Sequence, residues 1–135
     1  MIDVMIVEDD PMVLEVNKGF LERLEGYQLQ CCAENGKVAL ESAMEKPPDL
    51  ILLDMFLPDI SGMEVLQRIR HIDIPTDVIL ITAARDAKTV KQVFRLGAID
   101  YLVKPFRFIR FKQALDNYKK MCKIRFFFGN CLFGI

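Results

Sequence analysis

Acidic, hydroxyl and amino side chains stand at the end of four apolar runs of this sequence. They are Glu8, Asp9 and Asp10 after Met1–Val7, Asp54 after Leu50–Leu53, Thr82 after Asp77–Ile81, and Lys104 after Ile99–Val103. Clustered carboxylates raise one another's pKa unless a cation compensates their charge. Mg²⁺ fits such a cluster because it prefers oxygen ligands and an anionic partner. With a hydroxyl and an ammonium group to meet that anion, the set is typical of a phosphoryl acceptor with Asp54 as nucleophile.

The segments that carry these side chains alternate between strand and helix patterns. The predicted strands are Met1–Val7, Tyr27–Ala33, Leu50–Leu53, Asp77–Ile81 and Ile99–Val103. The predicted helices are Pro11–Leu24, Lys37–Glu45, Met63–Ile69, Lys88–Leu96 and a last helix marked by Phe111, Leu115, Tyr118 and Cys122. Continuous apolar strands favour a parallel sheet covered on both faces, and right-handed crossovers make it a doubly wound α/β fold. Ligands bind beyond the carboxyl ends of such strands, so we expect the polar ends to share one edge.

Local sequence signals indicate that two of the acidic residues, Asp10 and Asp59, lie outside the predicted site. Asp10 precedes Pro11 and is interpreted as the N-cap of the first helix, the alternative being a third metal-site carboxylate. Asp59 lies in the stretch PDISG, which has the composition of a turn. Gly26 is expected to end the first helix. The inward face of that helix is predicted to carry Val13, Val16, Phe20, Leu21 and Leu24.

Composition limits the classes of function that the chain can have. With 135 residues, 52% of them hydrophobic, the chain suits one folded domain. A net charge of −1 predicts no nucleic-acid or membrane binding by this segment. The acidic start does not resemble a secretory signal, and we expect a cytoplasmic protein. The four cysteines show no CxxC spacing and are interpreted as reduced structural thiols.

The ordered motifs, an acidic pair, LLDMFLPDISG, ITA and DYLVKPF, resemble the receiver domain of bacterial two-component response regulators. The resemblance covers about residues 2–121 and implies a flavodoxin-like, five-stranded parallel sheet of order 2-1-3-4-5 with five helices. It implies Mg²⁺ bound by Glu8, Asp9, Asp54 and the backbone carbonyl of Phe56, and a phosphoryl group accepted by Asp54. It further implies a switch hydroxyl at Thr82, a phosphate-pairing Lys104 before a cis Pro105, and a switch aromatic at Tyr101. Tyr101 fits a half-buried strand aromatic as well.

Two longer stretches resemble the regulators of citrate, malate and C4-dicarboxylate sensing. They are MIDVMIVEDDPMV and DYLVKPFRFIRFKQALDNYKK. Members of that group continue through a linker into a DNA-binding domain. In this chain we expect a receiver domain over 1–121 and an apolar tail over 122–135. The tail is interpreted as the remnant of a linker, with packing on its own domain or on a second copy as alternatives. The implied partners are a sensor histidine kinase and a second copy, paired through helix 4, strand 5 and helix 5.

Three other functions share part of this pattern. A stand-alone receiver in a phosphorelay has the same site. A phosphatase of the haloacid dehalogenase type requires a second aspartate two residues after the nucleophile, where this chain has Phe56. An FMN carrier of the same fold requires a phosphate-binding loop rich in glycine and hydroxyl groups, where this chain has EDDPM. We therefore expect a switch that is slowly dephosphorylated, and no turnover enzyme.

Overall fold

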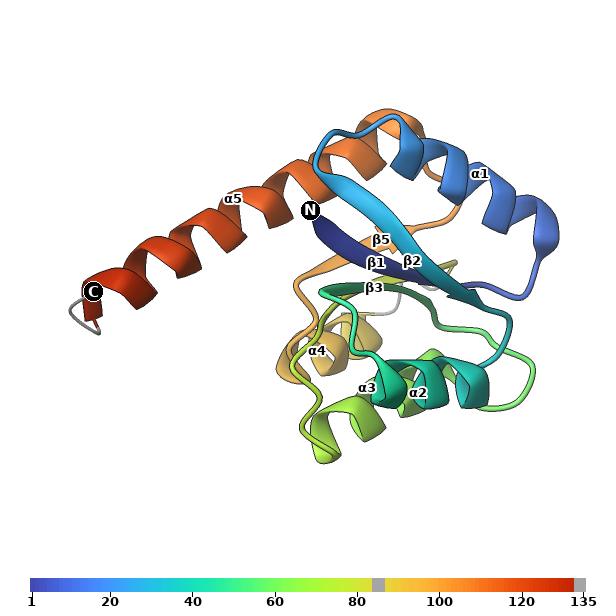
Figure 1. The fold of residues 1–135 in the computed structure, drawn as a ribbon. Coiled ribbons are helices and arrows are strands. Elements are labelled where there is room, and N and C mark those ends of the chain that lie inside the picture. Colours follow the sequence, from blue (N-terminus) through green and yellow to red (C-terminus); the bar gives the residue numbers. More distant parts are fainter. Residues whose placement is uncertain (84–86, 133–135) are drawn as a thin grey trace. The chain divides into compact units, whose positions relative to one another are not determined.

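A computed structural model describes residues 1–83 and 87–132, with side chains up to residue 128, so Ala84, Arg85 and Asp86 lie outside the described residues. Five parallel strands form one sheet in the order β2-β1-β3-β4-β5 (Figure 1). The strands are β1 (Ile2–Val7), β2 (Tyr27–Ala33), β3 (Leu50–Asp54), β4 (Asp77–Thr82) and β5 (Asp100–Val103). The helices are α1 (Pro11–Glu22), α2 (Gly36–Glu45), α3 (Gly62–His71), α4 (Ala87–Arg95) and α5 (Phe108–Leu132). The predicted fold class and strand order are confirmed.

Both faces of the sheet are covered, as the apolar strands predicted. In Figure 1, α1 lies on one face, and α2, α3 and α4 lie on the other. All five residues of β3, including its last residue Asp54, are buried. A strand buried on both faces has to be apolar along its length, and a charged group is tolerated only at its end. This explains why LILL precedes the aspartate.

The first helix begins as predicted and turns the predicted face inward, except at Val16. The side chain of Asp10 accepts hydrogen bonds from the backbone N–H groups of Met12 and Val13, at 2.9 and 3.5 Å, and Pro11 opens the helix. Helix α1 ends at Glu22, and the predicted inward residue Val16 is wrong, because it is 52% exposed. The buried position is Asn17, which lies near the centre of the arc occupied by the other predicted residues, whereas Val16 lies at its edge.

The chain divides into two compact units after Pro105, and α5 belongs to the second. The buried side chains of α5 recur at helical spacing, at Phe111, Ala114, Leu115 and Tyr118. The rings of Phe106 and Phe111 stack at 6.2 Å between centroids. The helix passes through residues 121 and 122 without a break, so the boundary between a receiver domain and a tail stays a prediction. None of the helices within 1–83 and 87–132 has the length and apolar character required to span a membrane.

Candidate functional site

Three carboxylates meet at the carboxyl ends of β1 and β3. Glu8, Asp9 and Asp54 each offer an oxygen, and these oxygens all lie within 4.8 Å of one another. Glu8 is 2% and Asp54 5% exposed, whereas Asp9 is open to solvent. Two buried carboxylates this close carry a large desolvation and repulsion cost unless cations balance them. The site therefore favours the binding of positive charge.

Lys104 supplies one such charge from the end of β5. Its Nζ atom lies 2.6 Å from Glu8 Oε1 and 3.1 Å from Asp54 Oδ2. Burial lowers the pKa of Lys104, but the hydrogen bonds and charges of the two carboxylates outweigh burial and leave this pKa above its usual value. The ammonium group is therefore fully protonated at neutral pH. The Lys104–Pro105 peptide bond is cis, as the resemblance implied.

Backbone N–H groups hold the two buried carboxylates in position. The N–H of Asp10 donates to Glu8 Oε2 at 3.1 Å, and the N–H of Phe56 donates to Asp54 Oδ1 at 3.2 Å. Because the Asp10 carboxylate caps α1, its interpretation as an N-cap is confirmed. The Phe56 side chain is largely exposed beside the site.

The sheet register brings Thr82 to the same edge. Asp54 pairs with Ile81 across β3 and β4, so Thr82 stands one residue further along. The backbone N–H of Lys104 donates to the carbonyl oxygen of Thr82 at 2.8 Å, which ties the end of β4 to the end of β5. Thr82 is fully buried. Tyr101 lies on β5 and is buried in the hydrophobic core of the first unit, as a strand aromatic would be.

The turn after Asp54 is held by a close backbone approach at Gly62. The N–H of Gly62 donates to the carbonyl oxygen of Met55 at 2.7 Å. A Cβ atom at Gly62 would lie 2.3 Å from the carbonyl oxygen of Asp54 and 2.7 Å from Met55 Cα. Only glycine fits here, which explains why a glycine follows the apolar run and Asp54 so closely.

Asp59 has a role that its sequence context did not reveal. Its carboxylate accepts hydrogen bonds from the backbone N–H groups of Gly36 at 2.8 Å and Lys37 at 2.9 Å, at the start of α2. These hydrogen bonds lower the pKa of Asp59 to about 2. Asp59 therefore anchors the loop after β3 to a helix N-terminus, where a negative charge is favourable. The turn was recognisable from PDISG, but its partner is 22 or more residues distant and carries no local signal.

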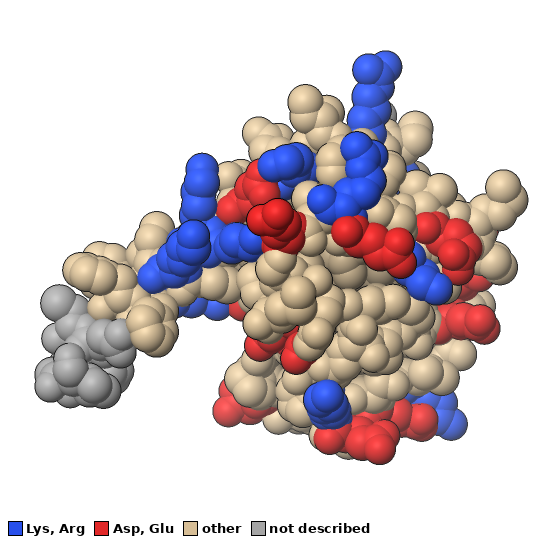
Figure 2. Space-filling view, turned by 45° about the horizontal axis from the view of Figure 1, so that its top comes forward, with Lys and Arg blue, Asp and Glu red and all other residues tan. Residues whose placement is uncertain are grey.

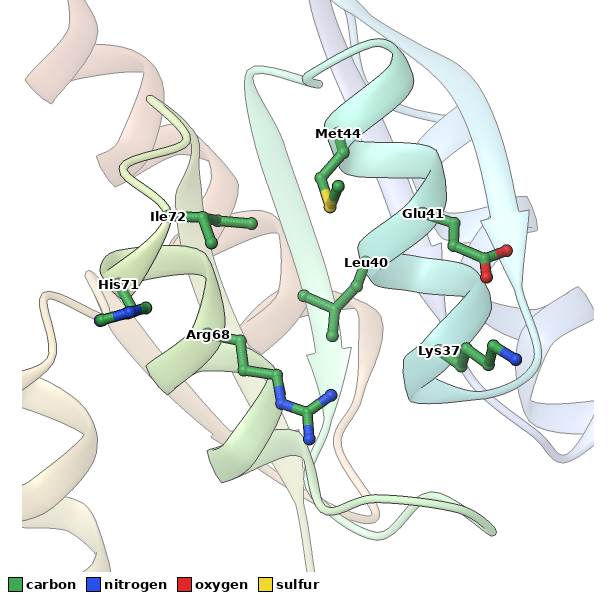
Figure 3. Close-up of a pocket in the computed structure, with 7 residues that line it drawn as sticks. All are labelled: Lys37, Leu40, Glu41, Met44, Arg68, His71 and Ile72. Atoms are coloured by element: carbon green, nitrogen blue, oxygen red, sulfur yellow. The ribbon is translucent and has the colours of Figure 1, made fainter.

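A separate cavity of about 410 Å³ lies between α2 and α3 (Figure 3). It is lined by Lys37, Leu40, Glu41, Met44, Arg68, His71 and Ile72. None of the predicted site residues is among them. Arg68 forms an ion pair with Glu64 at 3.0 Å on the same helix. The cavity is therefore distinct from the acidic cluster, which remains the candidate site.

The family of the chain follows from its sequence as well as from its fold. Residues 4–116 match the family model of the response regulator receiver domain. The chain belongs to this family, the receiver domains of two-component response regulators. The resemblance predicted from the ordered motifs is thereby confirmed.

Similarity to individual proteins indicates which group of response regulators the chain resembles. The chain is 46% identical over 116 residues to a probable C4-dicarboxylate response regulator DctR of Priestia megaterium, which covers 86% of this chain and 51% of the relative. It is 45% identical over 124 residues to the transcriptional regulatory protein MalR of Bacillus subtilis, with coverage of 92% and 53%. The solved receiver domain of a putative LuxO repressor protein from Vibrio parahaemolyticus superposes with a TM-score of 0.84 at 33% identity, covering 92% of this chain and 94% of that chain. The chain spans about half the length of the curated relatives it matches. The predicted likeness to the C4-dicarboxylate group is confirmed.

Proposed function

We propose that this chain is a phosphorylation switch in which Asp54 accepts a phosphoryl group from a sensor histidine kinase. The observation that carries the proposal is the environment of the Asp54 carboxylate. It is 5% exposed, lies 3.1 Å from the Lys104 ammonium, and has oxygens of Glu8 and Asp9 within 4.8 Å. The Lys104 ammonium is close enough to stabilise negative charge that develops on a phosphoryl group, and the neighbouring carboxylates offer ligands for a second cation.

The donor set of the site fits Mg²⁺. Glu8, Asp9 and Asp54 offer only carboxylate oxygens, which are the hard ligands that this ion prefers, and the backbone carbonyl of Phe56 would add a fourth oxygen. When bound, Mg²⁺ would offset the negative charge of the phosphoryl oxygens. We expect Asp9 to act as a direct ligand, since it is the one exposed member of the set.

In the proposed reaction, an Asp54 carboxylate oxygen attacks the phosphorus atom of a phosphohistidine on the kinase. A P–O bond forms and the P–N bond breaks, and its electron pair passes to the imidazole nitrogen of the kinase. Lys104 then exchanges its contact with Asp54 for a phosphoryl oxygen, to which Thr82 donates a hydrogen bond. Phe56 stands where a phosphatase would need a second aspartate, so we expect one transfer and no turnover.

The output of the switch is proposed to be a change in the surface formed by α4, β5 and α5. The movement of Thr82 toward the phosphoryl group would be coupled to the position of Tyr101. Coupling of about 1–3 kcal/mol between site and surface is enough for a switch of this kind. We propose that the altered surface pairs two copies and controls a transcriptional output located elsewhere in a full-length cytoplasmic regulator, and that this segment does not itself bind nucleic acid. The names of the relatives support C4-dicarboxylates as the class of signal.

The test is the intact mass of the protein after incubation with acetyl phosphate, with and without Mg²⁺. The proposal predicts one added phosphoryl group that requires both Mg²⁺ and Asp54, so the Asp54→Asn variant should gain none. An adduct on Asp54→Asn, or an adduct that forms equally well without a divalent cation, would contradict the proposed site.

A further inference from the structure

The end of α5 combines positive charge with exposed aromatic side chains. The segment 117–128, called here the basic–aromatic segment, carries Lys119, Lys120, Lys123 and Arg125 and no acidic residue. The whole chain has a net charge of −1, so the rest of the chain is acidic and hides this local excess. Figure 2 shows Lys and Arg side chains gathered along this helix before the residues drawn in grey.

Apolar side chains in the same segment face solvent to an unusual extent. The exposed fractions are 56% for Ile124, 72% for Phe126, 65% for Phe127 and 55% for Phe128. The rings of Phe127 and Phe128 contact each other edge to face, with centroids 5.8 Å apart. At about 100° per residue, Ile124, Phe127 and Phe128 fall within one arc of about 100° on the helix surface, whereas Phe126 lies outside this arc. Exposed apolar patches of this kind mark binding sites.

We propose that the basic–aromatic segment binds the surface of an anionic lipid bilayer. Lysine and arginine side chains are attracted to anionic headgroups, while the aromatic side chains enter the boundary between headgroups and acyl chains. The helix is too charged to span a bilayer, so it would lie in the interface. This function is independent of phosphoryl transfer to Asp54.

Charge favours a bilayer over a second copy of the chain as the occupant of this surface. In a symmetric pair that joined two of these segments, four basic residues of one copy would meet four basic residues of the other with no acidic residue in either segment, and like charges repel. An anionic bilayer has the opposite charge and accepts the exposed rings at the same time. A neutral bilayer accepts the exposed rings but does not attract the basic side chains.

The experiment is co-sedimentation of the full chain with lipid vesicles. One set of vesicles is phosphatidylcholine alone, and the other contains phosphatidylglycerol in addition. We expect binding to the anionic vesicles that decreases as salt is added, and much weaker binding to the neutral ones. The variant Lys120→Gln/Lys123→Gln should bind the anionic vesicles about 25-fold more weakly, since each lysine near such a surface contributes about a factor of five. Phe127→Ser/Phe128→Ser should weaken binding to both kinds of vesicle.

A matched variant separates local from general charge effects. Lys37→Gln/Lys46→Gln removes the same charge from two exposed positions near the ends of α2 and should bind as the unmodified chain does. Circular dichroism checks that each variant is folded. Equal loss of binding in both lysine pairs, or no binding of the unmodified chain to anionic vesicles, would overturn the proposal. A dimer in sedimentation velocity that dissociates on Phe127→Ser/Phe128→Ser, without vesicle binding, would assign the surface to a second copy instead.

Discussion

Replacement of Gly62 by alanine tests whether the turn after β3 holds Asp54 in place. The added Cβ atom would lie 2.3 Å from the carbonyl oxygen of Asp54 and 2.7 Å from Met55 Cα, both of them backbone atoms. A flexible side chain could rotate away from such an overlap, but backbone atoms of a buried strand end cannot. The turn, and with it the end of β3, therefore has to shift.

The expected cost is at the upper end of the range for overpacking, about 3 kcal/mol. For a domain of this size, a loss of that magnitude lowers the midpoint of thermal unfolding by roughly 10 °C. Urea unfolding that is monitored by circular dichroism measures the free energy of unfolding directly. Because Asp54 carries the strain, phosphorylation by acetyl phosphate should also slow in protein that remains folded.

Gly19 provides the matched control. It lies inside α1, and a Cβ atom there meets nothing within 4 Å. Gly19→Ala should stabilise the protein by about 0.5–1 kcal/mol, because alanine has the higher helix propensity. The reasoning is refuted if Gly62→Ala unfolds within about 0.5 kcal/mol of the unmodified protein, which is the usual range for a harmless substitution.

Three further predictions concern Lys104 and Phe56 at the site and Asp59 in the loop after β3. Lys104→Met leaves two buried carboxylates without their ammonium partner, so without Mg²⁺ the free energy of unfolding should fall by about 2 kcal/mol. Added Mg²⁺ should then stabilise the variant more than the parent in urea unfolding, and equal stabilisation would contradict a shared set of ligands. Asp59→Ala should be less stable than the parent at neutral pH, because the lowered pKa of Asp59 means that its ionised carboxylate stabilises the fold. This difference in stability should shrink as pH falls from about 4 toward 2, where the carboxylate of the folded parent becomes protonated. A gap that is constant from neutral pH to pH 2 would mean that the charge of Asp59 is irrelevant. Phe56→Asn should shorten the lifetime of phosphorylated protein if the exposed ring shields the phosphoryl group, and an unchanged lifetime would exclude shielding.

The sequence predicts strand content and the polar edge because each depends on local chemistry, whereas the strand order was implied only by the resemblance to receiver domains. A short apolar run such as LILL is typical of a strand buried on both faces, and Asp54 follows it directly. Asp10 and Pro11 define the start of a helix by themselves. These features require no knowledge of what the distant parts of the chain do.

Features that depend on distant partners could not be predicted in the same way. The carboxylate of Asp59 binds backbone groups at Gly36 and Lys37, and nothing in PDISG specifies them. One position on the inward face of α1, Val16, was predicted wrongly for a related reason. A spacing rule counts Val16 as apolar, but the packing of the helix decides which positions are covered, and it covers the polar Asn17 instead.

Lys104 links the stability of the site to its proposed function. Its ammonium group contacts Glu8 at 2.6 Å and Asp54 at 3.1 Å, so the fold can bury these carboxylates before any metal binds. Under the proposed function, the same contacts would have to be given up, at least in part, once Asp54 carried a phosphoryl group. The free energy of the switch is then a difference between two sets of ion pairs, and it can remain small even though each set is strong. A lysine that paired only with a phosphorylated state would leave the unphosphorylated carboxylates uncompensated, so under the proposed function a dual pairing of Lys104 would allow one fold to hold both states.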